Sequence, residues 1–180
     1  MGQSSLIDPE VLSSSDFNRL ISHIHDQTEI PEDVLQSLAT IYRAHSVDDK
    51  YGCQLLHRHY DMPENCIPLT TESGNDVSVT KVTPLGKVNY DSIRGQLYLL
   101  NNHGKFQAYE YEHGPPVKFP HAFLQELAAF IEEKGLHDKI CLTSSIDEKV
   151  RTEIQLGSQA TVTFPPKYLN SPEESHNDSS

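Results

Sequence analysis

Long apolar segments are missing from this 180-residue sequence. It has no run of about 18 apolar residues, which a transmembrane helix requires, so we expect no membrane association. Its first residues lack the basic and apolar regions of a secretory signal peptide. Cysteine is scarce, and three residues with no zinc-finger spacing (Cys53, Cys66 and Cys141) indicate free thiols in a reducing compartment. We therefore predict a cytoplasmic protein.

Basic residues are also few. The chain has 14 Lys and Arg against 26 Asp and Glu, which gives a formal net charge of -12. No cluster of Lys and Arg occurs, whereas binding to phosphate backbones needs a concentrated basic surface. We therefore expect no nucleic-acid partner, and the partner is predicted to be a small molecule or a protein.

Several catalytic and nucleotide-binding motifs are absent from the sequence. It contains neither G-x-G-x-x-G nor the G-x-x-x-x-G-K-[ST] phosphate loop, so nucleotide binding of those kinds is disfavoured. It also lacks the G-x-S-x-G nucleophile elbow and the H-E-x-x-H zinc motif. A function must therefore be sought in residues that no common motif marks.

Hydrophobic periodicity predicts an α+β fold, in which an N-terminal helical pair and one later helix pack on a mostly antiparallel sheet. The expected helices cover residues 16–27, with Ser15 as the cap, a segment beginning at Pro31, and residues 120–134, closed by Gly135. The two N-terminal helices are expected to pack together as a hairpin. Strands are predicted over residues 51–60, 66–72, 77–83, 96–100, 105–112, 139–145, 153–156 and 160–164.

The two ends of the chain differ in composition from the rest. Residues 1–15 are rich in serine, and we expect a flexible N-terminus there. Residues 170–180 are polar and acidic, which is typical of a disordered tail. Residues 16–169 are then predicted to form a single α+β domain with one core.

The segment over residues 51–60, YGCQLLHRHY, concentrates chemically active side chains. If it is a strand, His57 and His59 lie on one face about 6–7 Å apart along the backbone, so both imidazoles could bind one divalent metal. A third ligand would come from elsewhere. The candidates are Glu110, Glu112, Cys53, His103 and His113. The alternative is that one histidine is buried and the other exposed.

Two candidate catalytic residues accompany this pair. In the strand over residues 105–112, Glu110 shares the apolar face of Phe106 and Ala108, where an acid needs a specific reason, and Tyr109 and Tyr111 lie opposite. Cys53 is a candidate nucleophile, but it lies about 13 Å along a strand from His57, beyond hydrogen-bond reach. The alternative for Cys53 is a buried structural thiol.

Arg58 and Tyr60 lie on the opposite face of the predicted strand from the histidines. Together with Tyr109 or Tyr111 they could bind a carboxylate or phosphate ligand, because the Arg guanidinium offers two parallel hydrogen bonds. The alternative is a structural ion pair between Arg58 and one of the acidic residues.

Two functions of different classes follow from these residues. The first is a small soluble protein with a pocket built on His57 and His59, acting as a metal-assisted enzyme or as a small-molecule-binding protein. The second is a non-catalytic protein-interaction or ligand-binding module. The sequence leaves open whether the protein is an enzyme, and the surroundings of the two histidines decide between the functions.

Overall fold

The computed structural model describes residues 5–22, 28–74, 76–146 and 152–164. It confirms the predicted α+β class, with three α-helices and a nine-stranded sheet in the described residues. The elements in chain order are β1 (Ile7–Asp8), α1 (Ser14–Phe17), α2 (Glu32–Ala44), β2 (Gly52–Leu55), β3 (Cys66–Glu72), β4 (Ser78–Pro84), β5 (Ile93–Leu100), β6 (Phe106–His113), α3 (His121–Lys134), β7 (Ile140–Thr143), β8 (Thr152–Gln155) and β9 (Ala160–Phe164).

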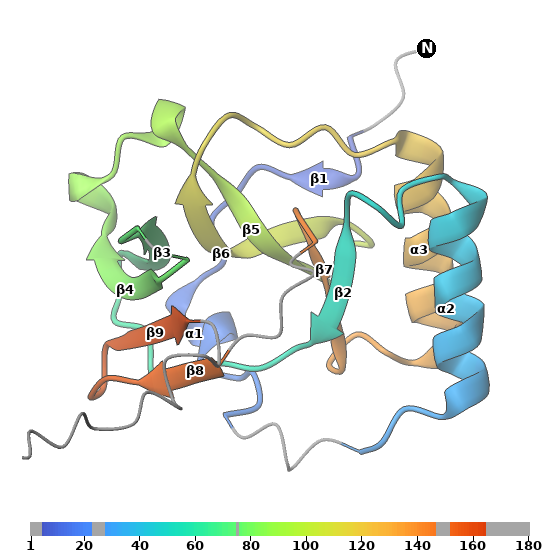
Figure 1. Ribbon diagram of the computed structural model, residues 1–180, viewed down its shortest axis with the longest axis horizontal. Helices are drawn as coiled ribbons and strands as arrows, with labels where there is room; N and C mark the ends of the chain where they lie inside the picture. The colour runs from blue at the N-terminus through green and yellow to red at the C-terminus, as the bar shows by residue number, and fades with distance from the viewer. Residues whose placement is uncertain (1–4, 23–27, 75, 147–151, 165–180) are drawn as a thin grey trace, which may run out of the picture.

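The sheet is mostly antiparallel and curls into a half-barrel (Figure 1). Its strand order is β2-β7-β5-β6-β3-β4-β9-β8, and β1 pairs with the start of β6. Only β1 and β3 run parallel to β6, and the other described pairs are antiparallel. The short strands β2 and β8 therefore form the two ends of the strand order. The predicted flexible segment over residues 1–15 includes β1 and the start of α1.

Two apolar clusters hold the sheet. The larger lies between the sheet and helices α2 and α3, which run side by side in Figure 1. Tyr42 of α2 meets Phe123 of α3 there, edge to face, with ring centroids 5.0 Å apart. The smaller cluster joins α1 and the segment after β2 to the sheet, and includes Phe17, Tyr60 and Tyr109. None of the helices in the described part of the chain has the length and apolar character needed to cross a bilayer.

The first predicted helix is wrong in its extent, because α1 ends at Phe17 and its N-cap is Ser13. The side chain of Asn18 bonds both the backbone N–H and the carbonyl of Met62, at 2.6 and 3.0 Å. Buried Phe17 stacks on Tyr60 at 6.4 Å. These long-range contacts override the helical pattern of the local sequence. The hairpin of two N-terminal helices is wrong as well, since α2 packs against α3. Residues 23–27 and 170–180 lie outside the described residues.

Candidate metal centre

The strand that carries the histidines is shorter than the sequence predicts. β2 covers Gly52–Leu55, and residues 56–60 leave the sheet, so the strand prediction is wrong for His57 and His59. The segment turns away because the backbone N–H of Arg58 donates to the carbonyl of Ile21 at 2.8 Å. Leu56 and Tyr60 are then buried in the smaller cluster, at 2% and 4% exposure.

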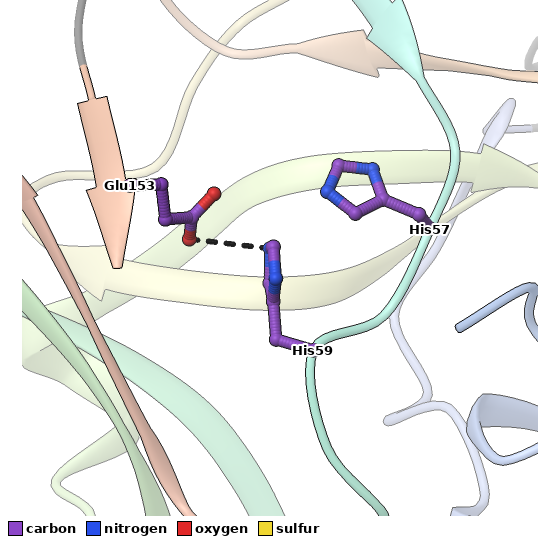
Figure 2. A group of neighbouring side chains, drawn as sticks. All are labelled: His57, His59 and Glu153. Carbon is purple, nitrogen blue, oxygen red and sulfur yellow. Dashed lines mark ion pairs between the residues drawn. The ribbon is translucent and has the colours of Figure 1, made fainter. Parts of the chain in front are cut away.

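The two histidines nevertheless converge, and Glu153 of β8 joins them (Figure 2). The imidazole rings of His57 and His59 meet edge to face, with centroids 4.6 Å apart. Nε2 of His59 lies 3.2 Å from Oε1 of Glu153. One potential ligand atom from each of the three residues lies within 4.8 Å of the other two. A group of two imidazoles and one carboxylate could therefore hold a divalent metal with small side-chain movements.

A hydrogen bond orients the ring of His57. Its Nδ1 lies 2.9 Å from the backbone carbonyl oxygen of Leu55, which can only accept, so Nδ1 carries the proton. Nε2 is then the ring nitrogen that could bind a metal. Metal-binding histidines in proteins commonly have this outer hydrogen bond, because it fixes both the tautomer and the ring direction.

The charges of His59 and Glu153 depend on each other. Burial alone would lower the pKa of His59, but the pairing with Glu153 and the nearby charge of Glu110 raise it. Burial opposes ionisation of Glu153, yet the bond to His59 and its charge hold the pKa of Glu153 below its usual value. Without a metal, the pair is therefore an ion pair, and a metal would have to displace the His59 proton.

Glu110 lies next to this group and is 8% exposed. Burial raises the pKa of Glu110 to about 7, although the charge of His59 lowers it in part. The carboxyl therefore exchanges its proton near neutral pH, as a general acid or base does.

The sequence analysis expected successive side chains of β6 to alternate between the two faces of the sheet, and this prediction is wrong at Tyr109. Leu97 pairs with Glu110 and Tyr98 pairs with Ala108, so Tyr109 is an extra residue between two ladder positions. Such a bulge reverses the alternation beyond it. Tyr111 consequently packs in the larger cluster, while Tyr109 packs in the smaller one. Glu110 lines a cavity and does not share a core with Ala108.

That cavity has a volume of about 870 Å³ and a mostly polar wall. His57, His59, Glu110 and Glu153 line it, together with side chains of the central strands. The volume falls in the range of sites for drug-sized ligands, about 300–1,000 Å³. The candidate metal group therefore faces a space that could hold a small molecule.

Tyr60 carries a buried hydroxyl for which the described structure offers no hydrogen-bond partner. Burial, followed by the charges of Glu110 and Glu153, raises the pKa of this hydroxyl, so it lies close to both carboxylates. An unsatisfied buried hydroxyl costs about 1–3 kcal/mol, and a bound water or ligand would remove that cost. Tyr60 does not line the large cavity but a neighbouring pocket, which it shares with His59 and Arg58, so a molecule bonded to this hydroxyl would lie in that pocket.

The other predicted site residues lie apart from this group. Arg58 donates from Nε to the carbonyl of Leu20 and pairs with Asp61, which is the ion-pair alternative. The Tyr109 hydroxyl is buried and donates to Sγ of Cys141 at 3.2 Å. Neither Arg58 nor Tyr109 lines the cavity, so neither joins the metal group.

Cys53 does line the cavity. Burial, and then the charge of Cys141, raises the pKa of its thiol far above the ordinary value. The thiol therefore stays protonated at neutral pH, and a protonated thiol is a weak nucleophile and metal ligand.

The sequence analysis missed Glu153. It lies 94 residues after His59, in the last hairpin, and no spacing links the two. Only the curl of the sheet brings β8 back to the segment that follows β2 (Figure 1). No family model matches the chain, and comparisons with curated proteins and with solved structures also found no match.

Proposed function

We propose that this protein binds a divalent transition-metal ion through His57, His59 and Glu153, and uses the ion to hold or activate a small molecule in the adjoining cavity. The observation that carries the proposal is the convergence of three ligand atoms within 4.8 Å from segments far apart in the sequence. Two histidines and one carboxylate would leave coordination positions open to the cavity.

Two neighbouring groups supply what such a site would use. Glu110 lines the same cavity, and burial raises its pKa to about 7 in the metal-free protein, so it is a candidate general acid or base. The Tyr60 hydroxyl is buried without a partner among the described residues, and it can donate a hydrogen bond to a water in the neighbouring pocket that His59 also lines. A metal ion would add Lewis-acid character to whatever molecule reaches its open positions.

Zinc titration of the chelator-treated, full-length chain tests the proposal. We expect saturable binding of one zinc ion per chain by isothermal titration calorimetry. Each of His57→Ala, His59→Ala and Glu153→Gln should weaken zinc binding by about tenfold or more, because each removes one ligand. The affinity should fall as the pH drops through the raised pKa of His59, whose proton competes with the ion.

His103→Ala is the matched control, because His103 is exposed on the turn between β5 and β6, away from the cavity. This variant should bind zinc as the wild type does. Zinc should also raise the melting temperature of the wild type, and the same zinc concentration should raise that of His57→Ala by less, since an ion bound only to the folded state stabilises it in proportion to its affinity. Equal zinc affinity in the wild type and in the ligand variants would refute the proposal.

A further inference from the structure

The cavity has a second polar group on its wall, formed by Arg94 of β5 and Glu112 of β6. The two residues are direct cross-strand partners, and Nε of Arg94 donates to Oε1 of Glu112 at 2.8 Å. The hydroxyl of Ser144 donates to the same oxygen at 3.3 Å. Both bonds end on Oε1 of Glu112. Neither bond involves Oε2 of Glu112 or the two Nη groups of Arg94.

Backbone packing restrains the guanidinium of Arg94. A Cβ placed on Gly114 would lie 3.0 Å from Nε of Arg94, so the glycine lets the side chain rest directly against the main chain. Gly114 also has φ +152°, which few other residues adopt. Arg94 is only 27% exposed, and it is held on one side by Glu112 and on another by Gly114. A guanidinium held in this way has lost much of its side-chain entropy before any ligand arrives.

The neighbouring wall is also ordered by hydrogen bonds. The hydroxyl of Thr70 donates to Oε1 of Gln96 at 2.9 Å and lies 2.8 Å from the hydroxyl of Thr80. This bond orients the Gln96 amide, whose NH₂ group is a further donor. Arg94 and Gln96 both line the cavity that also contains the two histidines.

Arg94 is the only lysine or arginine among the described residues that line this cavity. A divalent ion would balance Glu153, and Arg94 is already balanced by Glu112. A further acidic residue of the wall, Glu72, is exposed, and the guanidinium of Arg94 is the group of this wall that can bind a negatively charged ligand.

We propose that Arg94 binds a carboxylate of the small-molecule ligand through its Nη groups, while a second polar group of the same ligand reaches the metal at His57, His59 and Glu153. Only the contact between the ligand and the metal rests on the proposed function, and the contact with Arg94 does not. The Arg–carboxylate pairing is the strong, two-pronged kind, and Gln96 can add a third donor. The expected ligand is therefore a small acid, with a carboxylate at one end for Arg94 and a metal-binding group at the other end.

Titration with straight-chain dicarboxylates tests this subsite. Zinc-loaded, full-length protein, freed of unbound zinc, is titrated with malonate, succinate, glutarate and adipate by calorimetry. We expect at least one of them to bind more tightly than acetate, and the best chain length reports the span from Arg94 to the ion. Glutaramide, which has the same shape without charge, should not bind measurably.

Variants of Arg94 separate this proposal from the metal proposal. Arg94→Gln should weaken dicarboxylate binding by about tenfold or more and leave zinc affinity unchanged. Because Arg94→Gln leaves Glu112 unpaired, the double variant R94Q/E112Q provides a neutral, hydrogen-bonding pair if the single variant folds poorly. Arg43→Gln, on the exposed face of α2, is the matched control and should behave as the wild type.

The outcomes are distinct. Equal dicarboxylate affinity in the wild type and in the Arg94 variants overturns the inference, and so does a wild type that binds none of the acids. If zinc fails to bind but acetate or a dicarboxylate binds in an Arg94-dependent way, the proposed metal function is wrong and the Arg94 subsite stands. If zinc binds and the Arg94 dependence is present, both are supported.

Discussion

Replacement of Glu110 by glutamine should make the protein more stable at neutral and basic pH. In the folded state burial raises the pKa of Glu110 from 4.5 to about 7. Each pKa unit corresponds to about 1.4 kcal/mol, so the ionised carboxylate destabilises the fold by about 3 kcal/mol once the pH exceeds 7. Below pH 4.5 the group is protonated in both the folded and unfolded states, and this cost vanishes. Glutamine has a similar shape and no charge at any pH.

Urea denaturation of the metal-free wild type and Glu110→Gln between pH 4.5 and 8.5 measures the effect. The difference in unfolding free energy should grow in favour of the variant by about 3 kcal/mol across this range. Glu64→Gln, an exposed residue of a turn, should show no such growth. Bound zinc should shrink the difference, because a nearby cation stabilises the carboxylate. A difference that stays flat with pH would refute the assignment of Glu110 as a buried, proton-exchanging acid.

Two further predictions concern the sheet. Gly95→Ala should destabilise the fold by about 1–3 kcal/mol in urea denaturation, because its Cβ would lie 2.7 Å from that of Ala108 and press on Tyr98; an unchanged midpoint would contradict this packing. Glu153→Gln should speed hydrogen exchange of the β8 and β9 amides a few-fold in metal-free protein, since a half-exposed pair contributes about 0.5–1 kcal/mol. The ion pair exists only while Glu153 is ionised, which its lowered pKa ensures above pH 4.5, and while His59 is protonated, which its raised pKa extends to neutral pH. The faster exchange in Glu153→Gln should therefore disappear at high pH, and its persistence there would argue against the ion pair.

The sequence predicted the elements whose signals are local. Phe123, Leu127 and Ile131 recur at helical spacing and are all buried in α3, and Gly135 ends that helix with φ 63°. The strand over residues 66–72 is confirmed to the residue as β3. In these elements the local preference and the tertiary contacts agree, so periodicity and capping residues were sufficient.

The wrong predictions fall where distant contacts decide. α1 stops after one turn because Asn18 bonds to the backbone of Met62. The bulge at Tyr109 follows from how β5 and β6 pair, which residue types alone do not specify. For the candidate site, the sequence identified His57 and His59 through an assumed strand, and they converge for a different reason. Glu153 could not be identified, since the curl of the sheet brings it there.

The position of this group in the sheet gives it a structural consequence as well as a chemical one. A half-barrel leaves two free ends, here β2 and β8, and both strands are only four residues long. The pair between His59, just after β2, and Glu153, within β8, crosses the gap between those ends. A metal bound by the same residues would replace a half-exposed ion pair with coordinate bonds at the same place. Because the ion pair already joins these two segments without a metal, occupation of the site would strengthen an existing closure of the sheet and would not create one.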